Sequence, residues 1–407
     1  MHTVIVIGGG PAGLMAAISA SKLNKNVILL EKNEKLGKKL YITGKGRCNL
    51  SNDVDVNEFL ENVVSNKKFL FGAMHSFSSS DTIDFFENNG MPIKIERGKR
   101  IFPASDKASD VTKTLEKVCL KNGVDIRLNQ MVKSIKVDNS TVLGVFLENG
   151  EYISANSIIL ATGGVSYPLT GSDGEGHKIS KKLGHSITEL KPALVGIELN
   201  GDFYKNVQGL ALKNVKLIAN YNGKKIFDEL GETLFTHFGI SGPLVLSVSS
   251  LINRLDLKNL DFYLDLKPAL DYNTLDQKFI KEFRENSLKT ISVYLKSVLP
   301  HSLVDEVIIR AKINKDKKLS NLTAVDRDNL IKTLKRFELN IKKLRPIEEA
   351  IVTSGGINVK EINPKTMESK LISGLFFAGE IIDIDAFTGG FNIQIAFSTG
   401  HLAGLNA

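Results

Sequence analysis

The first 31 residues constrain the fold of this chain more than any other stretch. Residues 3–7 form a short apolar run that predicts a buried strand, and Gly8-Gly9-Gly10-Pro11-Ala12-Gly13 follows it directly and opens an Ala-rich helix. A second apolar run, residues 27–30, ends in Glu31. This order of elements is the fingerprint of a Rossmann-type dinucleotide-binding unit: a strand, a G-x-G-x-x-G turn, a helix and a second strand that ends in an acidic residue.

Each part of this fingerprint has a chemical role. Gly8 permits the tight turn, Gly10 lets the backbone approach a pyrophosphate at the helix N-terminus, and Gly13 lets the helix lie close to the sheet. Glu31 can accept hydrogen bonds from the hydroxyls of an adenosine ribose. A Gly-rich turn without a ligand does not account for Glu31. We therefore expect an adenine dinucleotide to contact Gly8, Gly10, Ala12, Gly13, Glu31 and Lys32.

Composition limits the class of protein. The chain has 407 residues, enough for two or three domains, and its two cysteines, Cys48 and Cys119, form no C-x-x-C pair. This argues against a disulfide framework and a dithiol redox enzyme, and it makes the cytoplasm the expected compartment. We expect no membrane span, because no run of about 18 apolar residues exists. We expect no metal site, because no His, Cys or Asp cluster has zinc spacing.

The pattern of elements predicts an α/β chain with an insertion. We expect residues 1–191 to form the first part of a nucleotide-binding domain and residues 346–407 to complete it. The inserted residues 192–345 change character twice: residues 192–268 show strand-like alternation, and residues 269–345 are helical and Lys-rich. Residues 57–120 are expected to be mostly helical, with an irregular segment at residues 98–103.

Three later motifs favour FAD over NAD as the bound nucleotide. The run Ile158-Ile159-Leu160-Ala161-Thr162-Gly163-Gly164 is a strand that closes in A-T-G-G. The run Gly374 to Glu380 is a strand that ends in Gly379-Glu380, with Asp383 beyond it, and it can place a carboxylate on ribityl hydroxyls or near the pyrophosphate. Thr388 to Gln394 places glycines at the start of a last helix, whose N-terminus could stabilise an anionic reduced flavin.

With these motifs in place, the chain resembles the YhiN/BaiN-like family of FAD-dependent oxidoreductases, a group within the two-dinucleotide-binding-domain flavoproteins. The resemblance covers nearly the full length. It is carried by IGGGPAG at 7–13, TGKGRCNLSN at 43–52, ATGGVSYPLTGSDGEGH at 161–177, LFTHFGISGP at 234–243, TSGGI at 353–357 and GLFFAGEIIDIDAFTGGFNIQIAFSTG at 374–400. It implies a glutathione-reductase-like FAD domain with an inserted β subdomain and helices, and a T-G-K-G-R-C-N loop that lies along the FAD.

The motifs and the resemblance together define the remaining expected cofactor contacts. Arg47 suits phosphate or flavin contacts, because a guanidinium can bind phosphate oxygens in a bidentate manner. The complete set is Gly44, Arg47, Cys48, Asn49, Val132, Thr162, Gly163, Gly379, Glu380, Asp383, Gly390, Asn392 and Ile393. We expect Cys48 to pack against the cofactor rather than to react, because it has no partner cysteine.

The resemblance also implies hydride transfer between flavin N5 and a small organic substrate. Activities in the family include reduction of steroid-type enones and oxidation of small amines, so both a conjugated C=C reductase and an amine oxidase remain open. A second strand-linked G-x-G-x-x-G is absent from the sequence. NAD(P)H, if it is the donor, is therefore expected to bind transiently at the flavin. A flavin-bound redox sensor without turnover is a further alternative.

Two residues are candidate proton donors. His237 lies in the unusual stretch Thr236-His237-Phe238-Gly239-Ile240-Ser241-Gly242-Pro243, and histidine is a common general acid in enzymes. Tyr167 follows the A-T-G-G strand. The alternatives are that His237 hydrogen-bonds its own loop and that Tyr167 caps the pocket. Arg100 is a weaker candidate for anchoring an anionic substrate.

The basic charge is concentrated in one segment. The chain carries a net charge of +8, and residues 310–346 contain 12 Lys or Arg but 4 Asp or Glu. A solvated face of Lys-rich helices is the favoured explanation, so a nucleic-acid partner is not favoured. The alternative is an RNA-directed, tRNA-modifying flavoprotein that docks through this segment. The sequence does not determine the oligomeric state.

Overall fold

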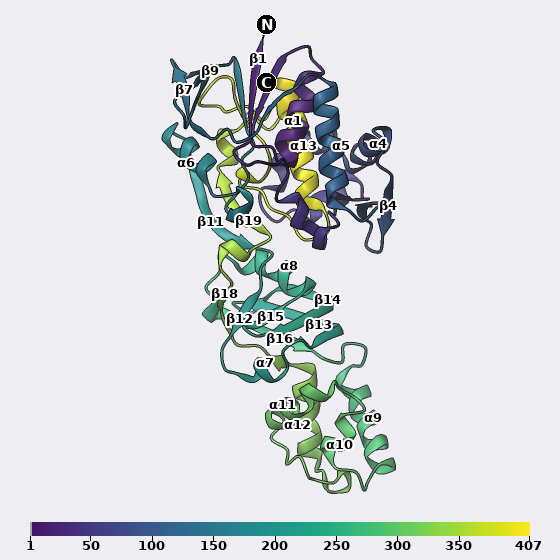
Figure 1. The fold of residues 1–407 in the computed structure, drawn as a ribbon. Helices are drawn as coiled ribbons and strands as arrows, with labels where there is room; N and C mark the ends of the chain where they lie inside the picture. Colours follow the sequence, from purple (N-terminus) through teal and green to yellow (C-terminus); the bar gives the residue numbers. More distant parts are fainter. Residues whose placement is uncertain (1) are drawn as a thin grey trace. The chain divides into compact units, whose positions relative to one another are not determined.

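The computed structural model describes residues 2–407, which form two compact units (Figure 1). Residues 2–193 and Pro346–Ala407 make up the first unit. The second unit is Leu194–Arg345. The chain therefore leaves the first unit after Ala193 and returns to it at Pro346, which makes the second unit an insertion.

A parallel five-stranded sheet forms the centre of the first unit. Its order is β20 (Leu375–Phe377), β10 (Ser157–Leu160), β1 (Thr3–Ile7), β2 (Asn26–Leu30) and β6 (Asp125–Arg127). The strands β1 and β10 are almost completely buried. Both faces of such a sheet are covered, which explains why these strands are continuous apolar runs rather than alternating ones. The mixed α/β fold with a Rossmann-type domain is the predicted fold class.

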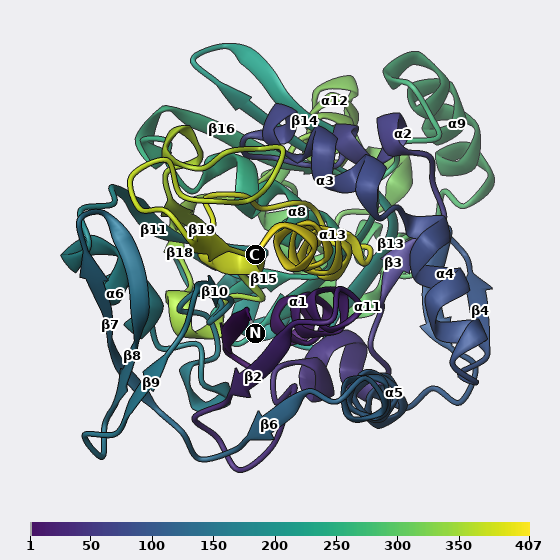
Figure 2. The same ribbon diagram turned by 90° about the horizontal axis from the view of Figure 1, so that it is seen from above.

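Two buried helices pack against each other beside this sheet. These are α1 (Pro11–Ser21) and α13 (Phe391–Asn406), which Figures 1 and 2 both show side by side. Glycines allow the close approach: a Cβ on Gly400 would lie 2.2 Å from the Ala12 carbonyl oxygen, and one on Gly404 would lie 2.3 Å from that of Ala16. The last helix of the chain is thereby fixed against the first one. The helix α5 (Ala108–Lys121) packs on the other side of α1.

Smaller elements surround this core. Two three-stranded antiparallel sheets are formed by β7 (Val132–Asp138), β8 (Thr141–Leu147) and β9 (Tyr152–Ser154), and by β3 (Ser51–Asn52), β5 (Arg100–Pro103) and β4 (Ile93–Glu96). The strands β11 (Ile187–Ala193) and β19 (Val352–Ile357) pair with each other. The remaining helices are α2 (Val56–Glu61), α3 (Phe71–Ser76), α4 (Ser79–Asn88) and α6 (Glu175–Lys182), with 3-10 turns at Leu40–Gly46, Lys67–Leu70, Pro168–Thr170, Ile347–Glu349, Val359–Glu361 and Gly379–Ile381.

The second unit is built on a seven-stranded antiparallel sheet. Its order is β17 (Phe337–Glu338), β16 (Leu260–Asp265), β13 (Ala211–Tyr221), β14 (Lys224–Thr236), β15 (Gly239–Ser241), β12 (Ile197–Leu199) and β18 (Ile341–Leu344). Asn222 and Gly223 join β13 to β14 with φ of 49° and 76°. Positive φ at both positions is what a tight hairpin turn requires, and Asn-Gly is the preferred pair for it.

Helices complete the second unit. They are α7 (Phe203–Asn206), α8 (Pro243–Ile252), α9 (Tyr272–Glu285), α10 (Ile291–Leu295), α11 (His301–Arg310) and α12 (Ala324–Lys335), with 3-10 turns at Leu257–Asn259 and Leu319–Asn321. Figure 1 shows α9 to α12 gathered as one group within this unit. Buried side chains of these helices and of the sheet form one apolar cluster.

The structure differs from the sequence expectation in three places. The expected irregular segment at residues 98–103 belongs to a β-hairpin, because β4 and β5 pair across the turn at residues 97–99. The stretch at residues 236–243 is not one loop, because His237 and Phe238 form a tight turn between β14 and β15 and α8 begins at Pro243. The helical part of the insertion ends earlier than expected, because β17 and β18 return to the sheet after α12. Among residues 2–407, no helix has both the length and the apolar character needed to cross a membrane.

Candidate functional site

The predicted nucleotide-binding loops meet at the carboxyl edge of the parallel sheet. The strands β1, β2, β10 and β20 pair in register, so Ile7 lies beside both Leu30 and Leu160, and Leu160 lies beside Phe377. The backbone continues this pairing: the Ala161 N–H donates to the Ile7 carbonyl at 2.9 Å. The segments after these strands therefore share one edge, which is where ligands bind in open α/β sheets.

The glycine-rich turn after β1 is built for close backbone contact. A Cβ on Gly13 would lie 1.9 Å from the Gly8 carbonyl oxygen, and one on Gly8, whose φ is +107°, would lie 2.6 Å from that of Ala161. Gly10 differs, because a Cβ there would meet no atom within 4 Å. The open space at Gly10 adjoins the first turn of α1, whose N–H groups have no intrahelical partner. This arrangement fits a phosphate group.

Glu31 is buried and its orientation is fixed by three hydrogen bonds. It accepts from the Gly9 N–H at 2.7 Å, from the Asn33 N–H at 2.8 Å and from Asn33 Nδ2 at 2.7 Å. An ionised carboxylate has about four acceptor positions, so capacity remains for a hydroxyl group. Lys32, the next residue, pairs with Asp173 at 2.5 Å. The acid of the fingerprint is thus held beside the glycine turn.

Two predicted cofactor residues carry buried oxygens that lack a partner. These are Asn49 Oδ1, in the T-G-K-G-R-C-N loop, and Thr162 Oγ1, in the A-T-G-G loop. An unsatisfied buried polar atom costs about 1–3 kcal/mol, and native proteins keep few of them. Both atoms therefore fit a ligand that supplies hydrogen-bond donors. With the open space at Gly10, they show that the residues present suit a bound dinucleotide such as FAD.

A charged cluster that the sequence did not reveal surrounds Glu380. Lys39 Nζ lies 2.7 Å from Glu380 Oε2 and 3.0 Å from Oε1, and each of the two side chains is 20% exposed. Ser166 Oγ donates to Glu380 at 3.0 Å, and the Thr353 N–H donates at 2.8 Å. Burial alone would raise the pKa of Glu380, but the Lys39 ammonium and these hydrogen bonds outweigh it and hold the pKa below its usual value. Glu380 is therefore a fixed anion.

Lys39, Ser166 and Thr353 are the residues that sequence reasoning missed. Each lies inside or beside a motif that was recognised: Ser166 follows A-T-G-G, Thr353 begins T-S-G-G-I, and Lys39 lies in the loop between Glu31 and Thr43. The only signal in the sequence that could have identified these three residues was their position inside or beside a recognised motif. Their shared contact with Glu380 depends on tertiary structure.

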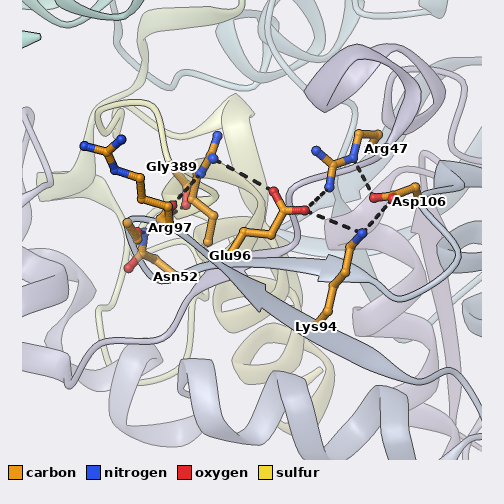
Figure 3. Close-up of polar contacts among 9 residues, drawn as sticks. Arg47, Asn52, Lys94, Glu96, Arg97, Asp106 and Gly389 are labelled. Atoms are coloured by element: carbon orange, nitrogen blue, oxygen red, sulfur yellow. Dashed lines mark hydrogen bonds and ion pairs between the residues drawn. The ribbon is translucent and has the colours of Figure 1, made fainter.

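Arg47 belongs to a surface network rather than standing free. Its guanidinium donates to Glu96, and Nε donates to Asp106 at 2.6 Å. Lys94 Nζ also bonds Asp106, at 2.6 Å, and Figure 3 shows Arg47 and Lys94 directed at the two carboxylates. The guanidinium lies over the Phe102 ring at 4.2 Å. The hydrogen bonds with Glu96 and Asp106 raise the pKa of Arg47. The expected contact of Arg47 with the cofactor stays a prediction, and a phosphate there would compete with both carboxylates.

Cys48 follows Arg47 but lies inside the protein. The side chain is fully buried, and burial raises the pKa of its thiol to about 12. The thiolate is the reactive form of cysteine, so this thiol is inert at neutral pH. The backbone of Cys48 has a φ of +59°, as part of the bend that turns the loop toward β3.

The T-G-K-G-R-C-N-L-S-N segment and the start of α13 lie against each other. Asn52 Nδ2 donates to the Gly389 carbonyl at 3.1 Å, as drawn in Figure 3. Gly390 has a φ of +100°, and a Cβ there would lie 2.3 Å from the Ser51 carbonyl oxygen. The Asn392 side chain bonds the Ala386 backbone at 2.8 Å and 3.0 Å. The N-terminus of α13 is therefore fixed beside this loop.

The other expected cofactor residues have the following places. Gly44, Gly163 and Gly379 have φ of +55°, +75° and +76°, and a Cβ on Gly379 would lie 2.7 Å from that of Ala12. Val132 is buried at the start of β7, Asp383 donates its N–H to Ile357, and Ile393 lies in the first turn of α13. Their contacts with a cofactor stay predictions.

The two catalytic candidates belong to different units. Tyr167 lies in the first unit, before the Pro168–Thr170 turn, and its N–H donates to the Glu348 carbonyl at 3.3 Å. His237 lies in the second unit, where it is exposed and packs edge-on against Phe238 with 5.1 Å between ring centroids. Arg100, the weaker candidate, donates to the Arg97 carbonyl at 3.0 Å. Each role stays a prediction.

Comparison with known proteins identifies the family. The sequence profile of the HI0933-like protein Rossmann domain matches residues 2–406. The chain belongs to this family. The resemblance inferred from the motifs is thereby confirmed, and the chain is a flavin-dependent oxidoreductase whose site fits FAD. The described residues hold no cluster of His, Cys, Asp or Glu that could bind a metal ion.

Three relatives are each 30% identical to this chain. One is the 3-dehydro-bile acid delta(4,6)-reductase of Clostridium scindens, 30% identical over 99% of this chain and 98% of its own length. The second is the ribosomal RNA dihydrouridine synthase of Escherichia coli, 30% identical over 97% of this chain and 95% of its own length. The third is the ribosomal RNA dihydrouridine synthase of Haemophilus influenzae, 30% identical over 99% of this chain and 97% of its own length.

Solved structures support the fold of the HI0933-like chain. A 3-ketosteroid delta1-dehydrogenase of Sterolibacterium denitrificans matches with a TM-score of 0.55 and 13% identity over 99% of each chain. A 3-ketosteroid-delta4-(5alpha)-dehydrogenase of Rhodococcus jostii matches with a TM-score of 0.52 and 15% identity over 100% of this chain and 96% of its own. At these identities the likeness concerns the fold alone.

Proposed function

We propose that this HI0933-like protein reduces a carbon–carbon double bond conjugated with a carbonyl group and uses NAD(P)H as the electron donor. The observation that carries the proposal is the chemistry shared by its relatives. A delta(4,6)-reductase of a 3-dehydro-bile acid and a dihydrouridine synthase act on different molecules, but both names describe the addition of two hydrogen atoms to such a bond. Because the chain has few cysteines and no disulfide framework is expected, we propose the cytoplasm as its compartment.

The residues at the sheet edge would bind and orient FAD, which supplies the hydride. The first turn of α1 offers N–H groups to the pyrophosphate, and Glu31 offers a carboxylate to the ribose. The N-terminus of α13 at Gly390 favours negative charge in front of it, because its free N–H groups and its dipole are positive. Lys39 and Glu380 neutralise each other, which leaves a fixed, preorganised polar wall with little net charge.

Reduction of a conjugated double bond needs a proton as well as a hydride. The overall balance is NAD(P)H, one proton and the unsaturated substrate giving NAD(P)⁺ and the saturated product. We propose His237 as the proton donor and Tyr167 as the alternative, since an imidazolium and a phenol both carry a transferable proton. Removal of the true donor should slow substrate reduction by a factor of about 10² to 10⁴, the usual contribution of general acid catalysis.

Anaerobic stopped-flow spectroscopy tests the proposal in two half-reactions. NADH or NADPH is first mixed with the FAD-loaded protein, and bleaching of the flavin band is followed. A 3-keto-delta4 steroid, a uridine-containing RNA or a primary amine is then supplied, and mass spectrometry identifies any product. We expect a nicotinamide nucleotide to bleach the flavin. We then expect an unsaturated substrate to reoxidise the flavin and to gain two hydrogen atoms.

Other outcomes would contradict the proposal. Bleaching by an amine, but not by NADH or NADPH, would indicate an amine oxidase. Bleaching without reoxidation by any substrate would indicate a redox sensor. His237→Gln and Tyr167→Phe form a matched pair for the proton donor: the true donor slows reoxidation by the substrate and leaves reduction by NAD(P)H unchanged. If neither variant slows reoxidation, both assignments are wrong.

A second candidate concerns the substrate: a uracil base within RNA. Two of the relatives carry the name ribosomal RNA dihydrouridine synthase and align with the chain over nearly its full length, including the second unit. The observation in this chain that favours RNA is a group of exposed lysines in the second unit that have no acidic partner. The dihydrouridine content of ribosomal RNA after incubation with protein and NADPH, measured by nucleoside mass spectrometry, tests this candidate.

A further inference from the structure

The basic segment at residues 310–346 owes its surplus charge to a few lysines. Most of its cations pair with carboxylates: Arg310 with Glu306, Lys317 with Asp326, Arg327 with Asp276, Lys332 with Asp328, Lys335 with Asp265, Arg336 with Asp261 and Glu338, and Lys342, Lys343 and Arg345 with Glu198. Lys312, Lys315 and Lys318 are exposed and form no ion pair with any described residue. The lysines without an ion pair therefore lie between α11 and α12, and a second surplus of positive charge lies at Glu198, whose single carboxylate is shared by Lys342, Lys343 and Arg345.

Folding adds two more lysines to these three. The segment 289–292 runs beside the segment 315–319: the Leu319 N–H donates to the Lys289 carbonyl at 2.9 Å, and the Ile291 N–H donates to that of Lys317 at 3.0 Å. The backbone of Lys289 thereby lies next to that of Lys318, because Thr290 and Lys318 form an antiparallel bridge. Lys296 follows at the C-terminal end of α10 and is also exposed.

We call Lys289, Lys296, Lys312, Lys315 and Lys318 the lysine surface. Lys317 lies among them but pairs with Asp326 at 2.6 Å. The neighbouring acid is Asp316, which is exposed in the same turn. Lys289 Nζ donates to Asn286 Oδ1 at 2.7 Å, and this neutral acceptor does not neutralise the charge of the lysine. Residues 312–318 hold three unpaired lysines and one free carboxylate, that of Asp316, so this segment has a positive potential that attracts anionic partners.

The lysine surface is displayed on an ordered framework. Ile291, Ile313 and Leu319, which lie close to its lysines in the chain, are at most 7% exposed and belong to the apolar core of the second unit. The backbone positions of the lysines are therefore fixed, while their flexible side chains can adjust to a phosphate backbone. Leu288, which is 82% exposed beside Lys289, adds an apolar group that can pack on a ribose or a base.

We propose that the lysine surface docks the phosphate backbone of a folded RNA. Fixed, unpaired lysines without a carboxylate network suit phosphates, whose binding is driven mainly by charge and release of counterions. This inference rests on the reductase proposal only for what is then done to the RNA. RNA binding itself is independent of it, so the two can fail separately.

Charge reversal tests the docking surface. The triple variant Lys289→Glu, Lys315→Glu and Lys318→Glu is compared with a control triple, Lys113→Glu, Lys117→Glu and Lys133→Glu, which changes three exposed lysines of the first unit by the same charge. Binding of fluorescently labelled ribosomal RNA, transcribed in vitro, is measured by anisotropy at several salt concentrations with the FAD-loaded proteins. Flavin bleaching by NADPH and reduction of a steroid enone are recorded for each.

The lysine-surface variant should lose at least tenfold in RNA affinity. Its slope of log affinity against log salt should fall by about two, since each lost phosphate contact removes about 0.7–0.9. FAD content and steroid reduction should stay as in the wild type. A triple change of the same lysines to Gln should give a smaller loss in the same direction, and it guards against misfolding of the Glu variant.

Three results would overturn the inference. An equal loss in the control triple would mean that net charge alone controls binding. Unchanged binding in both triples would mean that RNA contacts another face. The third result concerns vesicles that contain anionic phosphatidylserine. If the wild type binds them, and the same three changes abolish this binding while RNA binding persists, the surface docks a membrane instead. If RNA binding depends on the lysines but no unsaturated substrate is reduced, the docking surface stands and the reductase proposal fails.

Discussion

The ion pair between Lys39 and Glu380 gives the sharpest test of how this site is held. Lys39→Met removes the ammonium and leaves Glu380 bonded to Ser166 and Thr353. Breaking a buried pair from one side costs about 3–5 kcal/mol, because the remaining charge keeps its desolvation penalty. Both side chains are 20% exposed, and two hydrogen-bond donors remain. Since water can screen part of the charge, we expect a loss of about 2 kcal/mol in the free energy of unfolding.

A double-mutant cycle separates the charge from the packing. Glu380→Gln in the Lys39→Met background removes the charge that has lost its partner, and the Gln oxygen can still accept from Thr353. We expect the double variant to lie within about 1 kcal/mol of the wild type, which implies a coupling energy of at least about 1 kcal/mol. In a unit of this size, Lys39→Met alone should lower Tm by roughly 4–8 °C.

The effect should depend on pH. In the wild type the pKa of Glu380 is held below its usual value, so the pair stabilises the folded state above the ordinary carboxyl range, and this stabilisation is lost as the pH falls through the lower, folded-state pKa. In Lys39→Met, the ammonium no longer offsets the effect of burial, so the pKa of Glu380 rises. Protonation then relieves the penalty as the pH falls. The difference between the two proteins should therefore shrink from about pH 7 to about pH 4.

Urea denaturation in excess FAD, followed by circular dichroism, measures these free energies. FAD affinity is measured separately by flavin fluorescence, so that loss of cofactor is distinguished from loss of the ion pair. Lys38→Met is the matched control, because Lys38 pairs with Glu34, whose side chain is 65% exposed. The reasoning is refuted if Lys39→Met costs no more than this control, or if the losses in the double variant simply add.

Three further predictions concern the cofactor loops. Gly10→Ala should fold normally, because a Cβ at this position meets no atom within 4 Å, but it should lower the FAD content because the methyl group occupies the space for a phosphate. Gly8→Ala should lower the FAD content and also the Tm, because its Cβ would lie 2.6 Å from a carbonyl oxygen. Flavin absorbance per protein and differential scanning calorimetry check this pair, and a full FAD content in Gly10→Ala would contradict it. Thr162→Val should leave the FAD-free protein as stable as the wild type or more stable, because Thr162 Oγ1 has no partner, while it weakens FAD binding; equal FAD affinity would argue against a contact. Cys48 should resist iodoacetamide at pH 8 in the folded protein, since burial raises the pKa of its thiol to about 12, and rapid labelling seen by mass spectrometry would disprove this.

Local patterns in the sequence were enough to predict the fold class, the family and the glycine turn. The spacing of Gly8, Gly10 and Gly13 and the position of Glu31 act within one βαβ unit, where the geometry of a single turn dictates the residue type. The A-T-G-G and Gly379-Glu380 motifs also follow strands directly. Because parallel strands end at one edge, their order in the sequence implied that these motifs meet.

Contacts between distant segments could not be predicted in this way. Lys39 and Glu380 are 341 residues apart, and their pairing depends on how the loop after β2 passes the end of β20. Arg47 was expected at a phosphate, but it contacts Glu96, at the end of β4, and Asp106, in the turn after β5, and these two residues flank the segment 98–103 that was predicted as irregular. No periodicity in a sequence encodes such neighbours, because charged surface residues tolerate many positions.

The distribution of charge shows the same division between sequence and structure. The sequence determined that residues 310–346 carry an excess of eight positive charges, since composition fixes the sum. Only the tertiary structure decided which cations are neutralised, because each ion pair needs a carboxylate within reach. It also placed the backbone of Lys289 next to that of Lys318, through backbone hydrogen bonds between two segments that the sequence keeps apart. The sum of the charge is thus a property of the chain, and its pattern on the surface is a property of the fold.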